Sequence, residues 1–181
     1  MLTNSDKSYG WVTILLHWSM ALCIFFMFGL GVYMVDLSYY DTWYHGSLDL
    51  HKSIGSLLIA VWMVFFAWHL INKKPAPEPG KTWEQVSAKL MHKVLYLTIG
   101  ALLISGYLIS SADGAPIDVF GIVKLPAWQL EIENQETVFG DMHEILAWLL
   151  ISLVALHASA ALKHHFFDKD KTLKRMIKPI K

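Results

Sequence analysis

Four long stretches without a single charged residue dominate this chain of 181 residues. An α-helix rises 1.5 Å per residue and needs roughly 20 apolar residues to cross a bilayer core, so each stretch is about long enough to span a membrane. Hydrophobic residues make up 55% of the chain and charged residues only 17%, which argues against an ordinary soluble domain and against disorder. The four stretches cover residues 11–35, 54–71, 94–111 and 145–162.

These stretches predict an all-α fold, an integral membrane four-helix bundle that forms a single domain over residues 1–181. Three prolines between residues 72 and 80 exclude a helix there and separate two helical hairpins. The segment 112–141 mixes glycine and proline with apolar residues, and we expect it to form a cap on the outer surface. The expected helices cover about 11–35, 49–71, 89–111 and 142–165, followed by a basic tail over 166–181.

The distribution of charge predicts the orientation of the chain. Fifteen basic residues balance fifteen acidic ones, so the net charge indicates no nucleic-acid partner. Thirteen of the basic residues lie before the first span, between the second and third, or after the fourth, and only Lys52 and Lys124 lie on the opposite side. By the positive-inside rule, both termini and the middle connection are cytoplasmic.

Cys23 is the only cysteine and lies inside the first span. The chain therefore has no intramolecular disulfide and no C-x-x-C-H attachment for a c-type haem, so any haem is bound without thioether links. The first apolar stretch lacks the pattern of a cleavable signal, and we interpret it as a retained helix.

Four of the nine histidines fall within the expected helices, at His17, His51, His143 and His157. An ionisable side chain inside a bilayer costs several kcal/mol unless it is paired, so each is a functional candidate. His143 and His157 are 14 residues apart on one helix, which points them within about 40° of each other and separates them by about 21 Å along the axis. One helix could thus supply a ligand near each membrane face.

The topology supplies a partner for each of these two ligands. His17 and His157 share the inner half of the membrane, and His51 and His143 share the outer half. Two histidine pairs at two depths are what two non-covalent haem b groups need, since each iron takes one imidazole on each side. A zinc site would instead need three or four ligands at one depth. A hydrogen bond between helices is the alternative role for each histidine.

Glycines near these histidines have two interpretations. Gly55, one turn from His51, and Gly29 and Gly31 in the first span could let a flat macrocycle approach the backbone. Plain helix contacts use small residues in the same way.

The remaining histidines are expected in solvated positions, either in the outer loop or at the inner boundary: His45, His69, His92, His164 and His165. His164 has a second interpretation. It follows His157 by seven residues and continues the same helical stripe, close to Lys163 and Lys93. There it could hydrogen-bond a quinone carbonyl and deliver a proton.

Several motifs resemble the bacterial cytochrome b561 family over nearly the whole chain. They are Leu-His-Trp at 16–18, Leu-His-Lys-Ser-Ile-Gly at 50–55, the run Ile-Ser-Gly-Tyr-Leu-Ile-Ser-Ser-Ala-Asp-Gly at 104–114, and Ala-Leu-Lys-His-His-Phe-Phe-Asp-Lys-Asp at 161–170. Residues 34–44 look closest to an uncharacterised proteobacterial branch rather than to the branch that contains the superoxide oxidase.

This resemblance implies a protein of the bacterial inner membrane that binds two haem b groups and exchanges electrons with ubiquinone. Carried over by position, the four ligands fall on His17, His51, His143 and His157, and His164 matches a histidine associated with the quinone site. Family members often carry arginine near the inner end of the second helix, where this chain has Phe-Phe-Ala-Trp-His at 65–69.

Three functional classes follow from the sequence. The first is a free-standing di-haem cytochrome that links ubiquinone to a periplasmic donor or acceptor, with superoxide as one candidate. Ten acidic residues and only two lysines in segments 36–53 and 112–144 do not favour an anionic donor. The second is the membrane anchor of a larger quinone-linked dehydrogenase or hydrogenase. The third is a channel or transporter, for which the chain shows no broken-helix repeat and no intramembrane carboxylate pair.

Overall fold

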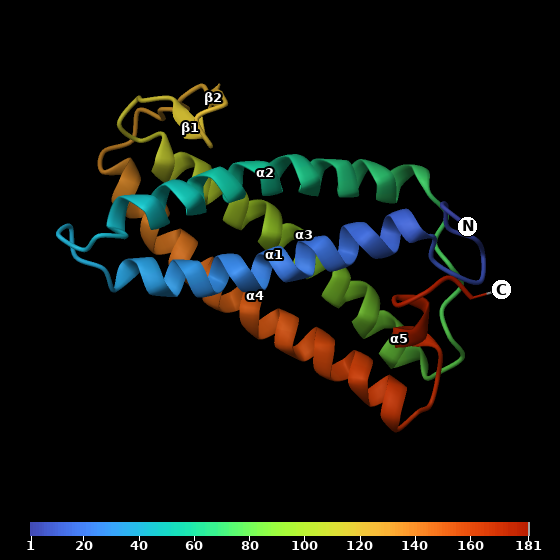
Figure 1. Ribbon diagram of the computed structural model, residues 1–181. Coiled ribbons are helices and arrows are strands. Elements are labelled where there is room, and N and C mark those ends of the chain that lie inside the picture. The colour runs from blue at the N-terminus through green and yellow to red at the C-terminus, as the bar shows by residue number, and fades with distance from the viewer. Residues whose placement is uncertain (181) are drawn as a thin grey trace. The chain divides into compact units, whose positions relative to one another are not determined.

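Four long helices make up most of the computed structural model, which describes residues 1–180 (Figure 1). They are α1 (Trp11–Val35), α2 (Tyr44–Ile71), α3 (Thr82–Ser110) and α4 (Gln135–Phe166). Each is long and apolar enough to cross a membrane, which confirms the predicted all-α class with four membrane-spanning helices. The last residue of the expected tail, Lys181, lies outside the described residues.

Three helices begin before their expected starts. α2 begins at Tyr44 instead of 49, α3 at Thr82 instead of 89, and α4 at Gln135 instead of 142. The expected starts followed the apolar stretches, but a helix continues beyond the apolar segment where polar residues suit its first turns. Glu84 and Glu136 lie in the first turns of α3 and α4, where a negative charge complements the positive end of the helix dipole.

The chain divides into two compact units, and every long helix contributes to both. The first, here called the terminal unit, comprises residues 1–21, 61–97 and the described residues from Ser152 onward. The second, here called the hairpin unit, comprises residues 22–60 and 98–151.

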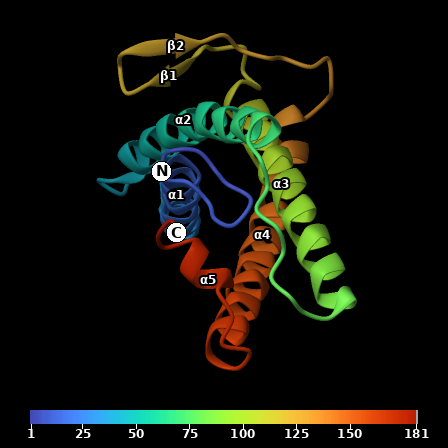
Figure 2. The same ribbon diagram turned by 90° about the vertical axis from the view of Figure 1, so that its right-hand side faces the viewer.

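In the terminal unit, the two ends of the chain and the α2–α3 connection are joined by hydrogen bonds. Asn4 Nδ2 donates to the carbonyl of Lys73 at 3.0 Å, and the amide of Ala76 donates to the carbonyl of Asp6 at 2.8 Å. The amide of Ile180 donates to Ser8 Oγ at 2.8 Å. The C-terminal tail after α4 carries the short helix α5 (Thr172–Arg175). Figure 2 shows the N- and C-terminal segments close together at one end of this unit.

The hairpin unit contains two short strands that the sequence analysis did not predict. β1 (Ile117–Val119) pairs antiparallel with β2 (Val123–Leu125). Phe120 and Gly121 have φ values of 55° and 71°, and Ile122 N donates to Val119 O, which forms a type I′ turn. The amide of Phe120 also donates to Ser53 Oγ at 3.1 Å, so the hairpin lies against the first part of α2 (Figure 1).

Candidate functional site

In the terminal unit, α1 and α4 bring His17 and His157 together. Their ring centroids are 6.4 Å apart, and the ring planes are inclined by 56°. Trp18 contacts the edge of the His17 ring at a centroid distance of 5.3 Å. The backbone carbonyl of Met176 in the C-terminal tail accepts a 2.6 Å hydrogen bond from the Trp18 indole, so the tail is attached beside His17.

In the hairpin unit, α2 and α4 bring His51 and His143 together in the same manner. Their ring centroids are 6.2 Å apart, with the planes inclined by 72°. The structure thus pairs the four histidines as their expected depths predicted.

Both separations fit one iron between two imidazoles. A metal lies about 2 Å from an imidazole nitrogen and the ring centre lies about 1 Å further, so two opposed axial imidazoles have centroids about 6 Å apart. The pairs at 6.4 and 6.2 Å therefore have the spacing of a bis-histidine haem site.

The neighbours of His143 fix the orientation of its ring. Nδ1 lies 3.1 Å from the carbonyl of Leu102 and 3.0 Å from Ser105 Oγ, and Ser105 is completely buried. A proton on Nδ1 that is donated to the carbonyl leaves Nε2 with a free lone pair for a metal. His17 and His51 have buried Nδ1 atoms without a hydrogen-bond partner in the described part of the chain. Buried polar atoms in proteins rarely lack a hydrogen-bond partner, so the environments of both rings are unusual.

Two glycines leave room for the rings of the second pair. A Cβ at Gly106 would lie 3.0 Å from Cε1 of His143, and one at Gly31 would lie 3.5 Å from Cε1 of His51. Because glycine has no side chain, both positions leave space beside these rings. At Gly55 the added Cβ would meet Met27 Cε at an ordinary 3.7 Å, so a haem-clearance role for Gly55 stays a prediction.

Three residues at these sites were not predicted from the sequence. Ser105 and Gly106 lie inside the motif at 104–114, which could have pointed to them. The contact of His92 with His157 was not predicted either, and their ring centroids lie 5.2 Å apart. Because α3 begins at Thr82, His92 lies ten residues into the helix, about 15 Å along its axis.

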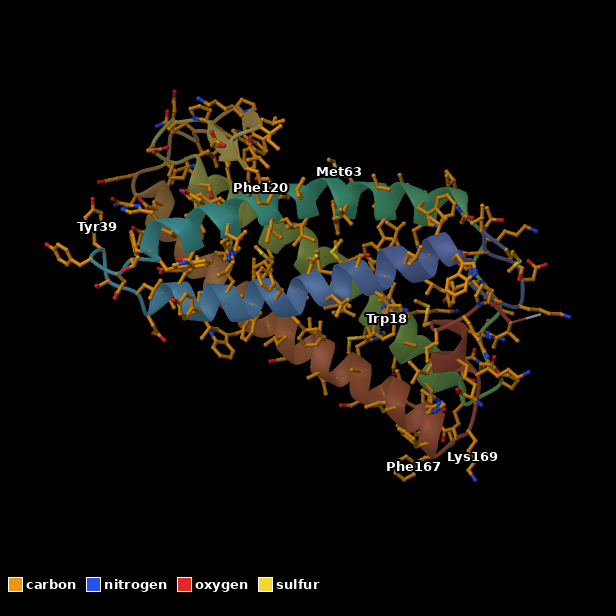
Figure 3. All side chains as sticks on the ribbon, in the orientation of Figure 1. Trp18, Tyr39, Met63, Phe120, Phe167 and Lys169 are labelled. Atoms are coloured by element: carbon orange, nitrogen blue, oxygen red, sulfur yellow. The ribbon has the colours of Figure 1, made fainter. Side chains whose placement is uncertain are left out.

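The other histidines lie away from the two pairs. His69 contacts Tyr96 and Phe65 at centroid distances of 5.6 and 6.5 Å. His45 packs against Tyr39, whose ring projects from the α1–α2 connection in Figure 3. His165 contacts Phe166 at 4.9 Å.

His164 lies at the end of α4 among charged groups. Its Nδ1 is 2.8 Å from a carboxylate oxygen of Asp168 and 3.2 Å from one of Asp170.

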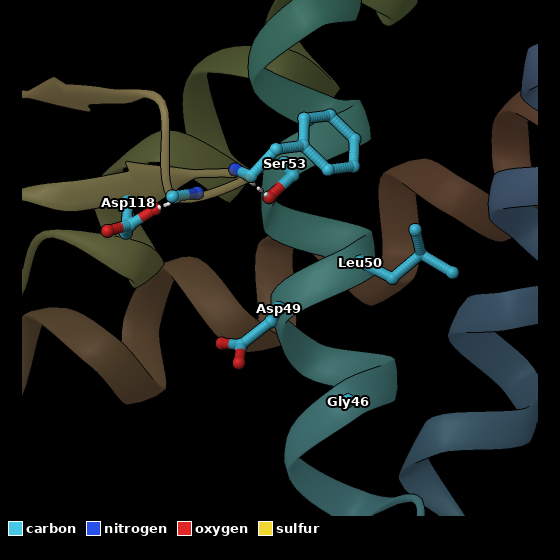
Figure 4. A pocket seen from close by; sticks show the side chains of 7 residues that line it. Gly46, Asp49, Leu50, Ser53 and Asp118 are labelled. Atoms are coloured by element: carbon cyan, nitrogen blue, oxygen red, sulfur yellow. Dashed lines mark hydrogen bonds between the residues drawn. The ribbon is translucent and has the colours of Figure 1, made fainter.

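A cavity of about 510 Å³ opens in the hairpin unit between α2 and the hairpin (Figure 4). Its lining includes Asp49, Leu50, Ser53 and Asp118, so the α2 residues of the lining lie on both sides of His51 in the sequence, and the cavity carries two acidic side chains. Asp118 accepts a hydrogen bond from the amide of Gly121, which fixes this carboxylate at the turn.

Comparisons with known proteins agree with this arrangement. Residues 8–179 match the family described as prokaryotic cytochrome b561. Cytochrome b561 homolog 2 of Escherichia coli (strain K12) is 45% identical over 97% of this chain and 94% of its own length. Cytochrome b561 homolog 1 of the same organism is 31% identical over 71% of this chain and 73% of its own. The probable superoxide oxidase CybB of Yersinia pestis is 28% identical over 94% of this chain and 96% of its own.

Four membrane-spanning helices, two opposed histidine pairs and a match over nearly the full length lead to one conclusion. The chain belongs to the prokaryotic cytochrome b561 family of haem-binding, multi-pass bacterial membrane proteins that transfer electrons.

Proposed function

We propose that this protein is a di-haem b cytochrome that transfers electrons across the bacterial inner membrane, between a periplasmic redox partner and the ubiquinone pool. His17 and His157 would hold one haem, and His51 and His143 the other. The observation that carries this proposal is the separation of the two pairs, 6.4 and 6.2 Å, which suits one iron between each pair of imidazoles. Bound haem would supply reversible one-electron chemistry at each pair.

The charge distribution supports a proposed orientation of the two histidine pairs in the membrane. Thirteen of the fifteen basic residues lie in 1–10, 72–93 and 163–181, which supports a cytoplasmic position for these segments. The His17–His157 pair then lies on the cytoplasmic side, and the His51–His143 pair on the periplasmic side. Electrons would pass between the two haems within the membrane.

The periplasmic partner is best described by charge. Asp49 and Asp118 line the cavity next to His51, and the outer segments 36–53 and 112–144 carry ten acidic residues and only two lysines. Such a surface attracts a cationic or neutral redox partner and repels an anion. The relative named as a probable superoxide oxidase supports superoxide only at 28% identity, and the acidic surface does not favour that anion here.

The quinone is proposed to bind at the end of α4, where His164 would donate a proton to a quinone oxygen. His164 follows the proposed ligand His157 by two helical turns, and its neighbour Lys163 carries a positive charge. A positioned donor there can serve a reaction that takes up protons together with electrons.

Haem analysis tests the first part of the proposal. Pyridine haemochrome assays should give two acid-extractable haems per chain, and one haem or covalent haem would contradict it. His17→Ala/His157→Ala should remove only one haem and His51→Ala/His143→Ala only the other. Loss of both haems from a folded double variant would show that the pairing is wrong.

Quinone kinetics test the second part. His164→Ala should keep both haem spectra and slow haem oxidation by a soluble ubiquinone analogue by roughly 100-fold, the effect expected for losing a positioned proton donor. His165 lies about 100° round the helix and serves as the matched control. Unaltered kinetics in His164→Ala would move the quinone elsewhere, with His92 as the next candidate.

A further inference from the structure

His164 is held from one side by two carboxylates that follow α4. Its Nδ1 lies 2.8 Å from Oδ2 of Asp168 and 3.2 Å from Oδ2 of Asp170. Both contacts are ion pairs when the imidazole is protonated, and the Nδ1–H direction does not meet the geometry of a hydrogen bond to either oxygen. Both acidic residues belong to the segment in which Phe167 and Lys169 are labelled in Figure 3.

The two carboxylates are themselves fixed by neighbours. Lys163 Nζ lies 2.7 Å from Oδ2 of Asp168 and 2.8 Å from Oε1 of Glu84 at the start of α3. Asp170 accepts a 2.8 Å hydrogen bond from the amide of Thr172, the first residue of α5. The imidazole therefore faces anions whose positions depend on α3, α4 and α5.

The two nitrogens of the His164 imidazole have different roles in this arrangement. In the protonated ring both nitrogens carry a proton, and the anions beside Nδ1 pair with the proton on that nitrogen. Both charged contacts of His164 are made through Nδ1, so Nε2 is the nitrogen available to a ligand. A quinone oxygen accepts a hydrogen bond and, on reduction, a proton, and both can come from an N–H at Nε2.

We propose that Asp168 and Asp170 are positioning residues that hold His164 through Nδ1 and present its Nε2–H to the quinone. This inference rests on the proposed quinone role of His164. In the proton step, the Nε2–H bond breaks, an O–H bond forms on the quinone, and the neutral ring regains its proton from cytoplasmic water. The charged groups that face His164 in the described residues are Asp168, Asp170 and, through Asp168, Lys163 and Glu84.

The test uses the full-length di-haem protein and the rate of haem oxidation by a soluble ubiquinone analogue, measured from pH 5.5 to 9. Asp168→Asn/Asp170→Asn removes both charges and keeps the shape of each side chain. We expect kcat to fall about tenfold with KM nearly unchanged. Asp168→Asn alone should show a smaller change of the same kind, and Asp168→Glu should restore most of the rate.

Asp6→Asn is the matched control. Asp6 is an exposed carboxylate of the terminal unit that pairs with Lys73 at 3.8 Å, so it reports the loss of one negative charge without a contact to His164. A native rate in the double variant, together with slow kinetics in His164→Ala, would overturn the positioning role but not the proposed quinone site. Native kinetics in His164→Ala would overturn both.

Discussion

The hydroxyl of Ser105 on α3 lies 3.0 Å from Nδ1 of His143 on α4, across the contact between the two helices. Ser105 is completely buried and also donates to the carbonyl of Leu102 at 2.8 Å. The Leu102 carbonyl lies 3.1 Å from the same Nδ1. This set of atoms determines the direction in which Nε2 of His143 points. Groups that orient a metal-binding histidine in this way often matter nearly as much as the histidine itself.

Ser105→Ala is therefore expected to weaken haem retention at the His51–His143 pair. Because the Leu102 carbonyl can still hold Nδ1, we expect a loss of about tenfold, the lower end of the range for such groups. Transfer of haem to apomyoglobin measures it. Ser56→Ala is the control, since within the described residues the Ser56 hydroxyl donates to the carbonyl of Lys52 in its own helix. Equal haem loss in both variants would contradict the role of Ser105.

Gly106→Ala should disturb the same site by a different mechanism. The added Cβ would lie 3.0 Å from Cε1 and 3.3 Å from Nδ1 of His143, which is closer than side chains pack without movement. The ring must move, and we expect a reduced amount of the haem at this pair with the other haem intact. Gly46→Ala on α2 is the control, because an added Cβ there would meet no other described residue within 4 Å beyond its own stretch of helix. A normal haem content in Gly106→Ala would show that the ring has room to shift.

Much of this arrangement could be predicted from the sequence, because a membrane imposes strong constraints. The four apolar stretches predicted the four helices. The charge distribution and the helical rise predicted the depth of each histidine, and so paired His17 with His157 and His51 with His143. The helix starts could not be predicted as well, since the polar first turns of α3 and α4 have no apolar pattern. His92 therefore lies ten residues into α3, further from its start than expected, and its contact with His157 was not predicted.

The β1–β2 hairpin escaped prediction for another reason. Its strands have three residues each, too few for an alternating pattern to be recognised, and its turn places the non-glycine residue Phe120 at a positive φ. The hydrogen bond from Phe120 to Ser53 joins residues 67 positions apart, so no local sequence pattern predicts it.

Arg175 connects the C-terminal tail to the α2–α3 connection, and its loss should destabilise the terminal unit. The guanidinium pairs with Glu78, with both side chains only 16% exposed, and donates to the carbonyl of Ala76 at 2.8 Å. We expect Arg175→Met to lower the free energy of unfolding by about 1.5–3 kcal/mol, the range for hydrogen bonds to charged groups. Thermal denaturation in detergent measures the change.

The neighbouring residue Lys174 provides the comparison for Arg175. Lys174→Met removes the same charge from α5 without touching the pair with Glu78. Because Met176 accepts the indole hydrogen bond of Trp18, the haem at His17–His157 should be released at lower temperature than the other haem in Arg175→Met. Identical melting of the two variants would mean that the ion pair contributes nothing to stability.

The contact between Lys163 and Asp168 should persist at neutral pH and break only in strong acid. The hydrogen bond from Lys163 holds the pKa of the exposed Asp168 carboxyl below its usual 3.8. A carboxyl with a lowered pKa in the folded state contributes its stability fully above the unfolded value, and the contribution is lost as the pH falls through the folded value.

The amides of Phe167 and Asp168 donate to the Lys163 carbonyl at 2.9 and 3.3 Å and report on the segment. Their protection from hydrogen exchange, corrected for the intrinsic rate, should be constant from pH 8 to 5 and decrease only below about pH 4. Asp168→Asn should show the decreased protection already at pH 6. A decrease in the native protein between pH 7 and 5 would contradict this prediction, since a carboxyl with a lowered pKa does not titrate there.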